Sequence, residues 1–256
     1  MPHDRTQLIR LGAIALAAGA TLSALADTAG AATPGSFGNN GASAVPTTLD
    51  GMKEKAATDI TDRVNDLNAA ITKVKAAQGL GAGQANLVSY LGTDIAPLQQ
   101  LNQTINGDST LPQAAHDFGT IFSDYRVYRL VLPAARIAAA ADHATTSAIP
   151  NLTTDAAKAQ ARVNPANQAT LQPLLNDLDS QIGTATNASN GLAATVLAFT
   201  PAQWNADTAL LHAPGSSDQT ATAALDKGRA DLRQIEQDLE ADHAASGATP
   251  TTSTTS

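Results

Sequence analysis

The sequence predicts an all-α protein, an elongated up-and-down antiparallel bundle of about five helices. Alanine, the best helix former, makes up about a fifth of the 256 residues, whereas aromatic residues make up only 3%. Valine, isoleucine and tyrosine are sparse and never alternate with polar residues over a useful length, as they would in strands. Leucine and isoleucine instead recur at spacings of three and four residues, which places them along one face of a helix.

Residues 1–31 have the layout of a secretory signal peptide. Two arginines precede the apolar run Leu11–Leu25, and small residues follow it. Cleavage fits after Ala26 or after Ala31, and the short polar spacer beyond the apolar run favours Ala31. The run is shorter than the ~20 apolar residues of a membrane span. We therefore expect it to be removed on export, and no stable membrane insertion afterwards.

Composition limits what the remaining chain can be. Residues 32–47 are rich in Gly, Ser, Asn and Pro and predict a flexible leader, and residues 246–256 predict a disordered Thr/Ser tail. The helical bundle is therefore expected over residues 48–245. The net charge of −8 argues against nucleic acid and anionic membrane surfaces as partners. Without cysteine, the fold depends on packing and not on disulfides.

Apolar stripes define the first two helices. The first is expected over about 50–78, where the stripe steps by four and three residues and Gly79 can cap the end. The second stripe runs from Leu87 to Ile105. Pro97 lies inside it, so we expect a kink there.

The third helix should start at a capping box formed by Thr110 and Gln113. Pro133 is expected to bend this helix and Pro150 to stop it. Whether 152–163 joins a neighbouring helix or forms its own is left open by the pattern. The stripe predicts that the inner face includes Leu111, Ala115, Phe118, Phe122, Tyr125, Arg129 and Leu132.

The C-terminal part is expected to hold a long, a short and a second long helix. Asn164 followed by proline is a favourable start, and the apolar rhythm then continues to Phe199. Thr200–Gln203 is a second capping box, which opens a short helix that carries Trp204. The final helix is expected over about 217–245. Short connections between long helices require antiparallel neighbours.

Two stretches resemble a known group of proteins. They are Ile121–Pro133 (IFSDYRVYRLVLP), with Ala141-Asp142 after it, and Leu197–Asn205 (LAFTPAQWN). Both are similar to segments of secreted, alanine-rich helical-bundle proteins of high-GC Gram-positive bacteria. The likeness covers most of 50–245 in layout and is specific only in the two stretches. That family is uncharacterised, so the resemblance implies an exported helical protein and supplies no catalytic residues.

Four neighbouring residues are candidates for partner binding: Tyr125, Arg126, Tyr128 and Arg129. Tyrosine and arginine are enriched at binding hot spots because a ring offers a large contact area and a guanidinium offers fixed donors. Aromatic faces with arginine could also hold sugars or an anionic polymer. The alternative is structural: the rings fill the core, and the arginine stems pack and pair with aspartates of neighbouring helices.

A metal site is a second possibility, because the tetrapeptide Ala-Asp-His-Ala occurs twice. If the third and last helices run parallel, Asp142, His143, Glu240 and His243 would meet at one end of the bundle. A di-iron bundle, however, needs two Glu-x-x-His motifs and further glutamates, and this chain has only three glutamates. We therefore predict no cofactor.

The sequence favours an exported, non-enzymatic bundle, secreted or associated with the cell envelope, that contacts an unknown protein or the cell wall. It holds no cysteine nucleophile, no Gly-x-Ser-x-Gly and no phosphate-binding loop. The alternative is a bundle that binds a small ligand or a metal.

The signal-peptide prediction is tested by N-terminal sequencing of the protein recovered outside the producing cell. The expected first residue is Ala32, or Asp27 if cleavage follows Ala26. Detection of an intact Met1 in this material would contradict the prediction.

Overall fold

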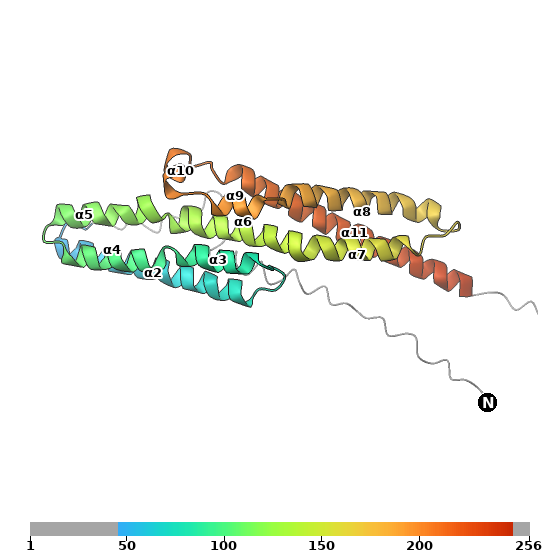
Figure 1. Cartoon of the computed structure of the whole chain (residues 1–256), viewed down its shortest axis with the longest axis horizontal. Coiled ribbons are helices and arrows are strands. Elements are labelled where there is room, and N and C mark those ends of the chain that lie inside the picture. The colour runs from blue at the N-terminus through green and yellow to red at the C-terminus, as the bar shows by residue number, and fades with distance from the viewer. Residues whose placement is uncertain (1–45, 248–256) are drawn as a thin grey trace, which may run out of the picture.

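The computed structural model describes residues 46–247, and these are organised as helices joined by short turns (Figure 1). Helices make up 84% of the structure and the described residues contain no strand, which confirms the all-α bundle. In the described part, no helix is both long and apolar enough to cross a membrane. The predicted signal peptide (1–31) lies outside the described residues, as do most of the leader (32–47) and the tail (246–256).

The first predicted helix is confirmed as α2 (Leu49–Ala76). Thr48 caps its start by accepting a hydrogen bond from the Gly51 amide at 3.2 Å. Ile60, Leu67 and Val74, one heptad apart, are buried along its inner face.

The second predicted helix is divided into α3 (Gly83–Gly92) and α4 (Ile95–Gly107). The expected kink at Pro97 is instead a break four residues earlier, at Thr93. A proline in a helix cannot donate to the carbonyl four residues before it, and its ring clashes with that carbonyl. Here that residue is Thr93, so the chain leaves the helix at Thr93 and Pro97 lies harmlessly in the first turn of α4.

The third predicted helix is a longer rod than expected, with residues 111–160 following one line (Figure 1). At 1.5 Å per residue the rod is roughly 75 Å long. The capping box at Thr110 does not form, because its hydroxyl donates to the Gln113 side chain and accepts no backbone N–H. Its segments are α5 (Leu111–Thr120), the π-helical turns η1 (Ile121–Tyr125) and η2 (Val127–Val131), α6 (Leu132–His143), the π-helical turn η3 (Ala144–Ala148) and α7 (Ile149–Gln160).

Pro150 does not end the rod, and residues 152–160 belong to it. Inside the rod, after α5, a π-helical turn precedes each of the two helices that carry a proline as their second residue: η2 before Pro133 and η3 before Pro150. At each junction a backbone N–H bonds to the carbonyl five residues earlier, from Leu132 to Val127 and from Ile149 to Ala144. This shift changes which carbonyl faces the proline, so the rod continues where an α-helical ladder would break.

Four helices follow the rod within the described residues: α8 (Gln168–Ser189), α9 (Leu192–Leu197), α10 (Pro201–Ala206) and α11 (His212–Gly247). Helix α8 starts later than predicted because the Asn164 side chain accepts the amides of Ala166 and Asn167 in a turn. The predicted long helix also ends before Phe199, since Gly191 takes a left-handed conformation (φ 68°). The capping box at Thr200 is confirmed.

Two successive hydrophobic cores lie along the rod. The first joins α2, α3, α4 and α9 to its N-terminal half, and the second joins α8 and α11 to its C-terminal half. The division falls between Ala141 and Ala144, where the rod passes from one core to the other. An ion pair at 3.3 Å between Arg136 of α6 and the buried Asp218 of α11 crosses this region. The rod is therefore common to both halves of the molecule.

The left-handed turn at Gly191 generates a prediction with a matched control. Gly191→Ala should lower the free energy of unfolding by about 1 kcal/mol, because an L side chain is strained at positive φ. Gly183→Ala should raise it by about 1 kcal/mol, because Gly183 lies within α8 with open space around it. Urea unfolding followed by circular dichroism measures both. Equal effects of the two substitutions would contradict this assignment.

Candidate functional site

The rod contains a local break at Arg126. This residue has φ 48° and ψ 33°, and it is the one non-glycine at positive φ among the described residues. Its carbonyl accepts three successive amides, those of Arg129, Leu130 and Val131, as η2 begins. A non-glycine residue persists in this strained region only where its surroundings hold it, and such positions and π-helical turns concentrate at functional sites.

Asn205 of α10 bridges this break. The Arg126 Nε donates to Asn205 Oδ1 at 2.7 Å, and Asn205 Nδ2 donates to the Ser123 carbonyl at 2.9 Å. The neighbouring Trp204 packs half-buried against the first core, which holds α10 in place. The two stretches on which the family resemblance rests are thus in direct contact. Sequence reasoning noted both stretches and did not foresee that Asn205 would join them.

Beside the break lies an aromatic–arginine patch, which we define as Arg63, Asp66, Phe118, Phe122 and Tyr128. The Arg63 guanidinium carbon lies 4.8 Å from the centre of the Phe122 ring and 4.9 Å from that of Tyr128. The two phenylalanine rings meet edge to face at 5.3 Å, and the Tyr128 hydroxyl donates to Asp66 at 2.8 Å. Two helices, α2 and the broken segment of the rod, therefore build the patch.

The two outer rings of the patch are exposed while its arginine is not. Phe122 is 40% exposed and Tyr128 is 36% exposed, and they are the exposed large hydrophobic side chains of the described residues. Arg63 is only 7% exposed and donates to the Asp59 carbonyl at 2.7 Å. The predicted inner positions of Ala115, Phe122 and Arg129 are therefore wrong, since all three are exposed. Their neighbours Ala114, Ile121 and Leu130 are buried instead.

Electrostatics hold Arg63 beneath the rings. Burial lowers the pKa of Arg63, and this is opposed by Tyr128 and by the carboxylates of Asp59, Asp62 and Asp66. Burial also raises the pKa of Tyr128, as does its hydrogen bond to Asp66. A buried guanidinium between two rings gains cation–π attraction, and its charge is balanced by the nearby carboxylates.

The four residues predicted as one partner-binding patch do not face one neighbour. Tyr125 is half-buried against the first core, and its pKa is raised by burial and by the charge of Asp94. Arg126 instead bonds to Asn205 of α10, and Tyr128 bonds to Asp66 of α2. Arg129 is exposed. The turn of the backbone at Arg126 separates these directions. The sequence analysis missed Arg63 and Asp66. Both lie among the apolar stripe residues of α2, and no motif around them indicates a binding site.

A second group of polar side chains consists of Asp94, between α3 and α4, with Tyr90 and Tyr125. Burial raises the pKa of Asp94 to about 6. Burial, and then the Asp94 charge, raise the pKa values of Tyr90 and Tyr125. The Tyr90 hydroxyl is enclosed and has no hydrogen-bond partner in the structure. Asp94 therefore acts electrostatically on a tyrosine of α3 and on a tyrosine of the broken segment of the rod.

The structure does not bring the metal candidates together. Asp142 and His143 lie midway along the rod, because the rod continues far past residue 149. Glu240 and His243 are exposed near the end of α11, which points away from the first core (Figure 1). Within residues 46–247 no three His, Asp or Glu side chains form a group that could hold a metal ion.

Asp142 and His143 instead hold the turn between α2 and α3. A Cβ added at Gly83 would overlap the Asp142 carboxylate, and one added at Gly79 would lie 2.9 Å from His143 Nδ1. The Thr146 hydroxyl donates to the Gly79 carbonyl. The first Ala-Asp-His-Ala motif therefore serves close packing of a turn on the rod.

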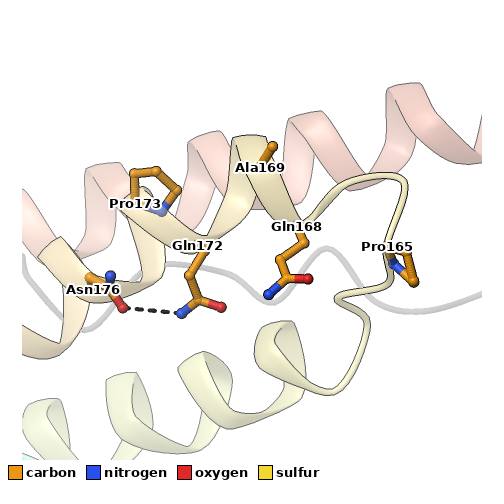
Figure 2. A pocket seen from close by; sticks show the side chains of 6 residues that line it. All are labelled: Pro165, Gln168, Ala169, Gln172, Pro173 and Asn176. Carbon is orange, nitrogen blue, oxygen red and sulfur yellow. Dashed lines mark hydrogen bonds between the residues drawn. The ribbon is translucent and has the colours of Figure 1, made fainter.

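A shallow depression of about 460 Å³ lies at the start of α8 (Figure 2). It is open to solvent, and within it Gln172 Nε2 donates to Asn176 Oδ1 at 3.0 Å. One helix and the turn before it supply all of its lining, so it does not enclose a ligand. The lining residues are Pro165, Gln168, Ala169, Gln172, Pro173 and Asn176.

Comparison of the chain with protein-family models, curated proteins and solved structures gave no match. The resemblance to secreted alanine-rich bundles therefore stays a prediction.

The raised pKa of Asp94 predicts a pH dependence of stability. Its pKa is about 6 in the folded state against an ordinary 3.8, so the folded state binds more protons between pH 4 and 6. Stability due to Asp94 is therefore present at low pH and is lost as the pH rises through 6. Asp94→Asn should raise the melting temperature at pH 7.5 and flatten its decline between pH 4.5 and 7.5.

Circular dichroism melts at these two pH values measure the effect, with the exposed Asp179→Asn as a control that keeps the wild-type decline. A lower melting temperature for Asp94→Asn than for wild type at pH 7.5 would show that the ionised carboxylate stabilises the fold.

Proposed function

We propose that this chain is an exported, non-enzymatic helical-bundle protein that acts by binding a protein or cell-envelope partner through the aromatic–arginine patch. The observation that carries the proposal is the exposure of Phe122 and Tyr128 on a fixed base, the buried Arg63. The remaining large apolar side chains of residues 46–247 are buried or half-buried.

The geometry of the patch supports contact with a macromolecule. Aromatic rings held in one orientation lose little conformational entropy on binding, so more of their contact energy is available to affinity. Tyrosine and arginine at the centre of a patch are typical of binding hot spots. The strained Arg126 and its bridge to Asn205 fix the segment between Phe122 and Tyr128, which sets the spacing of the two rings.

Export is supported by the sequence of residues 1–31, with its basic start, apolar run and small residues. The proposed location is therefore outside the cell or within its envelope. The heptad stripe of α2 supports coiled-coil-like packing inside the bundle.

The alternative of an enzyme or a small-ligand bundle has less support. Asp94, with a pKa of about 6, has a property of catalytic acids. The depression of Figure 2, however, lies at the start of α8, which packs in the second core, whereas Asp94 lies between α3 and α4, which pack in the first. The side-chain amides of the depression do not surround an enclosed cavity, so no observation favours a small-ligand site.

Partner capture from the producing cell tests the proposal. Affinity-tagged protein is crosslinked in place and its partners are identified by mass spectrometry, for wild type and for a Phe122→Ala/Tyr128→Ala double variant. The double variant should lose the partner by roughly tenfold or more, since truncated hot-spot residues cost over 1 kcal/mol each. Its melting temperature should fall, because both rings also stack on the buried Arg63, so capture is compared at a temperature at which both proteins are folded.

A Gln168→Ala/Gln172→Ala variant in the depression on α8 is the matched control and should capture the partner normally. Equal capture by wild type and by the aromatic double variant would refute the patch as the binding surface.

A further inference from the structure

We propose that the aromatic–arginine patch binds a basic segment of a partner protein, with a lysine or arginine of that segment stacked on Phe122 or Tyr128 and paired with Asp62. This inference rests on the proposed function and adds the chemical class of the partner. The patch lies where α2 packs against α5 and η2. Figure 1 shows that the α5–α6 junction is far from the α7 end of the rod and from the end of α11.

The charges around the exposed rings are predominantly negative. Asp59 is paired with Lys55 at 2.6 Å, so its charge is largely balanced. Asp62 is exposed, and Asp66 accepts the Tyr128 hydroxyl. Asp66, Asp62 and Arg63 are the charges that act on Tyr128, so negative charges outnumber positive ones at this ring. An approaching cation therefore meets an unbalanced negative charge at the edge of the rings.

The same charges argue against the anionic polymer considered from the sequence. Arg63 is 7% exposed, and its Nη1 already donates to the Asp59 carbonyl. Arg126, a second expected contact for an anion, donates to Asn205. An incoming phosphate or sulfate would instead approach the carboxylates of Asp62 and Asp66. The arginine that the patch contains thus serves to position the rings.

The rings themselves favour a cation. The face of an aromatic ring carries partial negative charge and attracts ammonium and guanidinium groups. Arg63 already lies over the rings of both Phe122 and Tyr128, which shows that the site accommodates this stacking. Over a third of each ring side chain is still exposed. A partner arginine can stack on this exposed part while its planar fork pairs with a carboxylate.

The charge of the whole chain selects a basic partner over a second copy. At −8, two copies repel each other, whereas a basic protein is attracted over distances comparable to the Debye length. We therefore expect association that weakens as salt is added.

The test uses a short fluorescent peptide of lysine, arginine and glycine, and the same peptide with glutamate in place of the basic residues. Fluorescence anisotropy follows binding to the full chain at low and at physiological salt. The basic peptide should bind and the acidic one should not. Asp62→Asn should weaken binding roughly three- to fivefold, as expected for one exposed charge pair, and Phe122→Ala roughly tenfold.

The matched control is Asp179→Asn, which removes one exposed carboxylate from α8 and should bind as wild type does. Asp62 and Asp179 are both exposed, and Asp62 also helps to balance the charge of the buried Arg63. Melting curves therefore verify that each variant is folded at the temperature of the binding assay. Equal weakening by Asp62→Asn and Asp179→Asn would show attraction to net charge alone and would overturn the inference. Preferential binding of the acidic peptide would overturn it as well.

Partner capture separates this inference from the proposed function. If capture is lost in Phe122→Ala/Tyr128→Ala but is unchanged in Asp62→Asn and at high salt, the patch binds a partner that is not basic, and only the inference fails. If the patch variants leave capture unchanged, both fail. Self-association of wild type that disappears in Phe122→Ala, measured by sedimentation, would identify a second copy as the occupant and overturn the inference.

Discussion

The continuity of the helical rod through its prolines is the constraint on which the rest of the structure depends. Pro133 and Pro150 would end an ordinary α-helix, and the π-helical turns η2 and η3 remove the conflict by shifting the backbone bonds to the carbonyl five residues earlier. Both hydrophobic cores are built on this rod. If it ended at Pro150, α8 and α11 would lose α7, whose Leu152, Ala156 and Ala159 form part of the second core.

The cost of that continuity is concentrated at Arg126. The backbone leaves the helical region there, with φ at 48°, and Asn205 satisfies the Ser123 carbonyl and the Arg126 side chain. Strain of this kind costs of order 1–3 kcal/mol and persists because neighbouring contacts enforce it. Its consequence is geometric: Tyr125 packs against the first core, Tyr128 donates to Asp66, and Phe122 is left exposed beside Arg63. A helix without the break would direct these rings differently.

Polar groups are buried where helices break, and this gives the protein its chemical character. Asp94 lies at the α3–α4 break and Arg63 faces the break of the rod. Burial raises the pKa of Asp94 and lowers that of Arg63, which in both cases favours the uncharged form. Arg63 is compensated by two rings and several carboxylates, so it becomes a fixed support for the exposed patch. Asp94 has no such partner, so it makes the fold sensitive to pH. Similar burial thus leads to different consequences, decided by what surrounds each group.

The sequence by itself determined the features that depend on neighbours within one or two helical turns. The all-α class, the inner stripe of α2 and the capping box at Thr200 follow from spacing and local hydrogen bonding, and the structure contains them. Tertiary structure decided whether Pro150 ends the rod, where the chain breaks before Pro97, and which rings are exposed. Arg63 joins Phe122 and Tyr128 across two helices, and Asn205 reaches Arg126 from a third. Such contacts depend on how distant helices are placed against each other, and no pattern along the chain records that placement.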